Sequence, residues 1–123
     1  MPIVNRIGEL AAEMTEWRRE MHMHPETAFE EEWTSRYIRE RLETFGMDEI
    51  HTGIAKTGLV AVLRGQGSSD AAIGLRADFD ALDITELNDL PYKSRNPGKM
   101  HACGHDGHTA MLLGAAKYMA ETR

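Results

Sequence analysis

Apolar residues recur at helical spacing in the first part of the chain. From residue 5 to about residue 21, one face would carry Ile7, Leu10, Met14, Trp17 and Met21. Steps of three and four residues place side chains on the same side of an α-helix, so this pattern predicts an amphipathic helix with Asn5 as its N-cap. Pro25 disfavours helical angles at His24, which predicts that the helix ends there.

Two further helices are predicted. The first runs from about residue 30 to Phe45 with apolar positions at Trp33, Tyr37, Ile38 and Leu42, and Gly46 suits the left-handed residue that often ends a helix. The second begins at Asp106 or Gly107 and continues to the end of the chain. Asp106 would be its N-cap, and its many small residues suggest close packing on a sheet.

Between these helices the hydrophobic pattern changes to short apolar runs. "GLVAVLRG" at 58–65 and "AAIGLRAD" at 71–78 are separated by a turn rich in Gly and Ser, which predicts a β-hairpin, and a further short strand is expected near 49–51. The second run ends in charge at Asp78 and Asp80. Ligands bind at that end of the strands in open α/β sheets.

The order of these elements predicts an α/β fold in which helices pack on a β-sheet. A last strand is expected after the final helix, so the sheet would be truncated. We expect residues 1–123 to form one compact unit with an incomplete sheet.

Composition narrows the range of partners. The 123 residues carry a formal net charge of -6 with no basic stripe, so nucleic acid is not expected as a partner. No apolar run approaches the roughly 20 residues that span a bilayer, and a membrane role is not expected. A single cysteine cannot form an internal disulfide, and the first residues do not resemble a secretory signal. A cytoplasmic location is therefore expected.

The stretch "MHACGHDGHTAML" at 100–112 combines the only cysteine with three of the six histidines. Thiolate and imidazole are usual ligands of zinc-like ions. Cys103 and His105 are two residues apart, so they can face one ion from an extended loop ahead of the helix. Asp78 and Asp80 could also be ligands, but we favour their accepting the other imidazole N–H of His105, Asp80 more than Asp78.

Other interpretations of these residues stay open. Cys103 could be a small core residue with the histidines as loop residues, or a nucleophile paired with a histidine base, although no oxyanion feature accompanies it. Haem attachment would need a second cysteine. His22 and His24 are expected to cap the end of the first helix, and His51 is expected at the surface.

Three segments together carry a resemblance to a known family. They are "REMHMHPETAFEE" at 19–31, "GLRADFDALDITE" at 74–86 and "PGKMHACGHDGHTAMLLGAA" at 97–116. In this order they resemble the N-terminal part of the zinc-type amidohydrolases and metallopeptidases. That family includes hippurate hydrolase, N-acyl-amino-acid amidohydrolases (aminoacylases) and the plant hydrolases of auxin conjugates.

The resemblance implies a zinc-exopeptidase-like catalytic domain with an inserted lid or dimerisation domain, of which this chain is the N-terminal part. It implies Cys103 and His105 as ligands, with the thiolate able to bridge two divalent ions, and Asp78 and Asp80 lining the site. Zinc or manganese is expected, with cobalt and nickel as further candidates. One departure is Asp83, where the family usually has proline.

Two functions follow as hypotheses. The first is hydrolysis of the amide bond of an N-acyl amino acid or dipeptide by a metal-activated water, with the general-base glutamate supplied downstream of this chain. Residues 1–123 alone are then expected to be inactive. The second is a non-catalytic α/β module that covers its exposed sheet edge by forming homo-oligomers. The sequence does not indicate which acyl group or amino acid is preferred.

Overall fold

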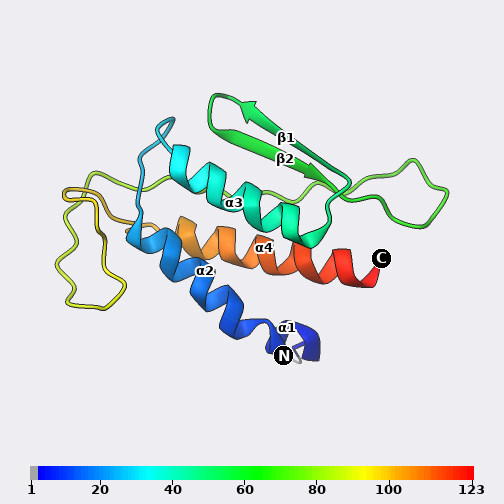
Figure 1. The fold of residues 1–123 in the computed structure, drawn as a ribbon, viewed down its shortest axis with the longest axis horizontal. Coiled ribbons are helices and arrows are strands. Elements are labelled where there is room, and N and C mark those ends of the chain that lie inside the picture. The colour runs from blue at the N-terminus through cyan, green and yellow to red at the C-terminus, as the bar shows by residue number, and fades with distance from the viewer. Residues whose placement is uncertain (1–2) are drawn as a thin grey trace.

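A computed structural model describes residues 3–123 of the chain (Figure 1). The elements in chain order are α1 (Asn5–Glu9), α2 (Ala11–Met23), α3 (Glu32–Phe45), β1 (Glu49–Ile54), β2 (Gly58–Val62) and α4 (His105–Thr122). The architecture is thus a mixture of helices with one two-stranded antiparallel sheet. None of the described helices combines the length and apolarity that a membrane crossing requires.

The three long helices form a layer in which α4 lies between α2 and α3 (Figure 1). Side chains from all three meet in the buried core, which contains Trp17, Met21, Ile38, Leu42, Ala110 and Leu113. At Gly114 a Cβ atom would lie 2.6 Å from Sδ of Met14, so the absence of a side chain lets α2 and α4 approach closely. We predicted that α4 packs on a sheet, whereas it packs between two helices.

The predicted hairpin is wrong in its pairing. β2 pairs with the preceding strand β1, with Glu49 opposite Val62 and Ile50 opposite Ala61, and the predicted partner at 71–78 forms no strand. A short turn joins β1 to β2, with positive φ at Ala55 and Lys56. Closing this short turn orders fewer residues than closing a longer Gly/Ser loop, which favours the local pairing. The sheet packs against α3 on the side away from α4 (Figure 1).

The boundaries of the first and the last helix differ from the prediction. The first helix is interrupted at Leu10, which is fully buried, and Val4 rather than Asn5 is its N-cap. α4 begins at His105 after Gly104, whose φ is 93°, so Asp106 lies in the first turn and is not the N-cap. Gly46 does end α3 in the left-handed conformation, with φ 78°, as predicted.

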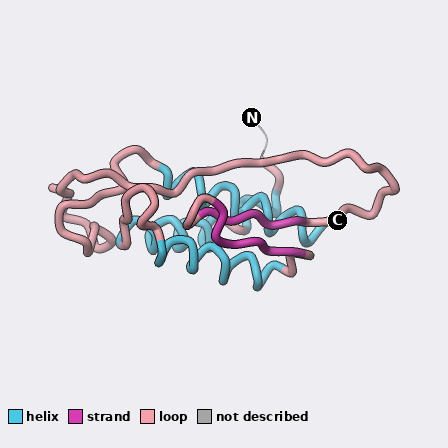
Figure 2. Tube along the Cα trace, turned by 90° about the horizontal axis from the view of Figure 1, so that it is seen from above, coloured by secondary structure: helices cyan, strands magenta, loops and turns pink. Residues whose placement is uncertain are grey.

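A long segment from residue 63 to residue 104 contains no helix or strand and runs along the molecule as loop (Figure 2). Two isolated bridges fix its middle part: Ala81 pairs with Thr27, and Leu82 pairs with Met100. The amide of Ala81 donates to the carbonyl of Glu26 at 2.8 Å. These contacts hold residues 78–82 in an extended conformation beside the start of α4.

The central position of α4 predicts a strong effect of Leu113→Ala. Leu113 is 2% exposed, and its removal leaves a cavity between α2, α3 and α4. We expect the free energy of unfolding to fall by about 2–5 kcal/mol in urea denaturation. The control is Met111→Ala on the same helix. Met111 is 59% exposed, so the change is expected to stay within about 0.5 kcal/mol. Equal losses in the two variants would contradict the packing described here.

Candidate metal centre

Three potential metal ligands meet where residues 78–82 pass the start of α4. Asp78, His105 and His108 each offer a ligand atom, and these atoms lie within 4.8 Å of one another. Asp78 and His105 are partly buried, whereas His108 is exposed. The two imidazole rings are stacked, with centroids 5.4 Å apart.

Local geometry explains why these side chains converge. His105 and His108 are the first and fourth residues of α4, and a spacing of three places side chains on the same helix face. Asp78 and Asp80 are two residues apart, and both carboxylates lie beside the His105 ring, at Nε2 and Nδ1 respectively. The hydroxyl of Thr109 donates to the main-chain carbonyl of Asp78 at 2.9 Å and fastens this segment to α4.

Asp80 determines how His105 presents its ring. Nδ1 of His105 lies 2.9 Å from Oδ1 of Asp80 and 3.0 Å from the main-chain oxygen of the same residue. Because both partners are acceptors, Nδ1 carries the proton when the ring is neutral. Nε2 then has a free lone pair, and it lies 3.7 Å from Oδ2 of Asp78. The expected contact between Asp80 and His105 is thus present, while its role in metal binding stays a prediction.

Asp78 is held as an anion. Its Oδ1 accepts a hydrogen bond from Nδ1 of His108 at 2.9 Å. This bond lowers the pKa of Asp78 below its usual value, against burial, which acts in the opposite direction. The carboxylate is therefore charged at neutral pH and available to a cation.

The donor set fits a divalent metal ion. Two imidazoles and a carboxylate are ligands that zinc and related ions commonly take. The three groups would hold one ion between them. Asp80 would then occupy the position of the carboxylate that orients a ligating histidine.

The structure brings three of the four predicted site residues together and leaves the fourth apart. Asp78, Asp80 and His105 are in contact, but Cys103 is exposed in the loop before α4 and is not part of the three-residue group. Its role as a ligand stays a prediction. His108 was not among the predicted site residues. Its spacing of three from His105 at a helix start was the signal that could have identified it.

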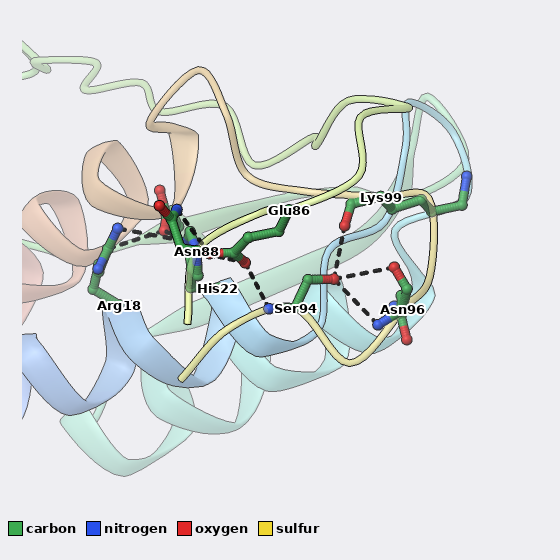
Figure 3. Close-up of polar contacts among 8 residues, drawn as sticks. Arg18, His22, Glu86, Asn88, Ser94, Asn96 and Lys99 are labelled. Atoms are coloured by element: carbon green, nitrogen blue, oxygen red, sulfur yellow. Dashed lines mark hydrogen bonds and ion pairs between the residues drawn. The ribbon is translucent and has the colours of Figure 1, made fainter. Parts of the chain in front are cut away.

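A second group of polar side chains forms a buried network around His22 (Figure 3). Nδ1 of His22 lies 2.8 Å from Oδ2 of Asp106, and Nε2 lies 3.2 Å from Oε1 of Glu86. The three residues are 3%, 1% and 7% exposed, respectively. The predicted helix cap is therefore wrong for His22. It holds for His24, whose Nδ1 bonds to the carbonyl of Glu20 at 2.8 Å.

Charge stabilises this network. The hydrogen bond to Asp106 raises the pKa of His22, burial opposes the shift, and Glu86 adds to it. Burial alone would raise the pKa of Asp106, but the hydrogen bond with His22 and the nearby cationic groups outweigh it, and that pKa lies below its usual value. An imidazolium between two carboxylates follows. The partners of His22 lie 64 and 84 residues away along the chain, so no local pattern could have revealed them.

Of the three histidines in the stretch 100–112, His101 is the one that is buried. It is 4% exposed, and neither ring nitrogen forms a hydrogen bond with residues 3–123. Burial lowers its pKa, so the ring is neutral at pH 7. His51, by contrast, is exposed as predicted and pairs with Glu49 at 2.8 Å.

Known proteins resemble this chain over nearly its whole length. It is 48% identical to hippurate hydrolase of Campylobacter jejuni over 98% of this chain and 31% of that protein. It is 46% identical to N-acyl-L-amino acid amidohydrolase of Geobacillus stearothermophilus over 95% of this chain and 31% of that protein. The chain therefore spans less than a third of the length of these curated relatives.

A solved structure and a family profile agree with these relatives. The YxeP protein of Bacillus subtilis, described as a dinuclear metal-binding peptidase of the M20 family, superimposes with a TM-score of 0.87 and 39% identity. The match covers 94% of this chain and 32% of that structure. Residues 74–123, which include Asp78, His105 and His108, match the profile of peptidase family M20/M25/M40. The chain thus belongs to the M20 family of peptidases and amidohydrolases, as a segment that corresponds to about a third of its relatives.

Proposed function

We propose that this chain is the N-terminal, metal-holding part of an amidohydrolase that cleaves the amide bond of N-acyl amino acids or dipeptides. The observation that carries the proposal is the convergence of Asp78, His105 and His108, with Asp80 on the far side of the His105 ring. The relatives that are named hippurate hydrolase and N-acyl-L-amino acid amidohydrolase support the substrate class. We also propose a cytoplasmic location.

Each residue of the candidate site would have a defined role. Asp78, His105 and His108 would hold a divalent ion, zinc or manganese first, and Cys103 would join them after a movement of its loop. Asp80 keeps the proton of His105 on Nδ1, which leaves Nε2 free to bind. When bound, the ion polarises the scissile carbonyl and activates water for its attack. The general base would be supplied by a segment equivalent to the two thirds of the relatives that this chain does not match.

Zinc binding to the purified chain tests the donor set. We expect the native chain to retain zinc after dialysis, as measured by mass spectrometry per protomer, and to lose it to EDTA. His105→Ala should abolish retention, and Asp80→Ala should weaken zinc affinity about 10- to 100-fold, because it removes the orienting carboxylate and leaves the three ligands in place. His51→Ala is the control, since His51 is exposed and distant along the chain. Retention that survives His105→Ala would refute this ligand assignment.

Hydrolysis tests the reaction. Residues 1–123 loaded with zinc or manganese are expected to hydrolyse hippurate no faster than the free metal does. A chimaera that joins them to the remaining part of the Geobacillus relative is expected to hydrolyse N-acetyl amino acids. Cys103→Ala and His105→Ala should each abolish that turnover, with His51→Ala as the control. Full activity of a folded chimaera that lacks both side chains would show that they do not support the chemistry.

A second candidate function is a non-catalytic module that self-associates. One observation favours it: residues 71–76 are exposed and have no strand partner among the described residues, and they include Ile73 at 90% and Leu75 at 55% exposure. Exposed apolar backbone of this kind can pair with another chain.

Light scattering after gel filtration distinguishes the two functions. A self-associating module is expected to show a mass that rises with protein concentration and returns to that of a monomer in Ile73→Asp. The control is Leu87→Asp, because Leu87 is 92% exposed on a different part of the loop. A monomer at all concentrations would exclude this second function.

A further inference from the structure

The buried network around His22 connects three separate parts of the chain. His22 belongs to α2, Asp106 to the first turn of α4, and Glu86 to the long loop. Arg18 adds a second cationic contact, with its Nε 3.0 Å from Oδ2 of Asp106. Neither His22 nor Glu86 is one of the residues that would touch the ion.

We propose that His22 is a positioning residue for the metal centre, which acts through Asp106 on the direction of His105 and His108. The proposal rests on the metal site proposed above, because the direction of these rings matters only if they share an ion. It concerns a residue of α2 that makes no contact of its own with the three-residue group.

Asp106 occupies a position on α4 from which it can affect both histidine rings. Asp106 lies between the two histidines, in the turn that presents both rings. Its Oδ2 is held by His22 at 2.8 Å, and its Oδ1 accepts the amide N–H of Gly107 at 2.9 Å. Rotation of this turn would separate a buried carboxylate from its cationic partner, which is costly in the protein interior. His22 therefore limits the rotation of the turn.

The two nitrogens of the His22 ring bind to two different parts of the chain. Nδ1 reaches Asp106 on α4, whereas Nε2 reaches Glu86 on the loop. Glu86 in turn accepts the amide of Ser94 at 2.7 Å and the side-chain amide of Asn88 at 3.2 Å (Figure 3). Loss of the Nε2 contact would therefore loosen residues 86–94 of the loop, and loss of the Nδ1 contact would loosen the start of α4.

Two amide substitutions separate these effects. The side-chain NH₂ of asparagine takes a position close to that of Nδ1, so His22→Asn can still donate to Asp106. The NH₂ of glutamine takes a position close to that of Nε2, so His22→Gln can still donate to Glu86 but not to Asp106. Both variants keep a polar side chain at position 22. His22→Ala is less suitable, because the buried carboxylates of Asp106 and Glu86 would both lose this partner.

Cobalt titration of the native chain and both variants is the first measurement. We expect His22→Gln to weaken Co²⁺ affinity about 10- to 100-fold and to change the visible absorption bands of the bound ion. His22→Asn should keep both close to native, as should the control Glu86→Gln. Urea unfolding of the metal-free proteins, measured in parallel, should show that both His22 variants lose stability.

Ring nitrogen NMR spectra of the metal-free proteins are the second measurement, and they do not depend on an ion. We expect the His105 and His108 signals to shift in His22→Gln and to stay in place in His22→Asn. Equal shifts in both variants, or a Co²⁺ affinity that follows only the loss of stability, would overturn the positioning role. If the native chain binds no Co²⁺ while the signals shift in His22→Gln alone, the proposed metal function fails and the coupling of His22 to the two rings stands.

Discussion

Two carboxylates in the interior of this small protein need a positive charge beside them, and His22 supplies it. Asp106 and Glu86 are almost completely buried, and an unpaired charge at either position would cost several kcal/mol. The imidazolium of His22 meets this need for both at once. As a consequence α2, the start of α4 and the long loop are joined at one point. Two of the candidate metal ligands, His105 and His108, lie one residue before and two residues after Asp106.

The helical part of the fold could be predicted because its signals are local. The apolar stripe of α2 and the glycine after α3 each depend on residues within a few positions of one another, and Trp17, Met21 and Gly46 lie as the pattern indicated. The strand pairing could not be predicted in the same way. The run at 71–78 is as apolar as β2, and only the geometry of the short turn after Ile54 shows which neighbour β2 takes.

The candidate site likewise contains residues that could be predicted from the sequence and residues that could not. His105 and Asp80 were expected to meet, because a ligating imidazole needs an acceptor for its second nitrogen and a carboxylate stood at the end of a predicted strand. His108 could be identified only from its spacing of three from His105, because it becomes a neighbour of His105 once both lie in the first turn of α4. Glu86 could not have been found at all, since its contact with His22 spans 64 residues and arises only once the loop folds back on α2.

The same features relate this chain to its longer relatives. It contains an oriented histidine, a charged aspartate and a rigid helix start, and it matches about a third of hippurate hydrolase and of the dinuclear M20 peptidase. The exposed apolar run at 71–76 lies next to these ligands along the chain. A candidate metal site beside an exposed apolar run is consistent with the chain's match to about a third of these longer proteins.

X-ray absorption at the zinc edge of the loaded chain tests the central claim most directly. The account predicts nitrogen and oxygen neighbours at about 2.0–2.2 Å, with the outer-shell scattering of two imidazole rings. A sulfur neighbour at about 2.3 Å in addition would show that Cys103 joins the group. A spectrum without imidazole scattering would contradict the assignment of His105 and His108 as ligands.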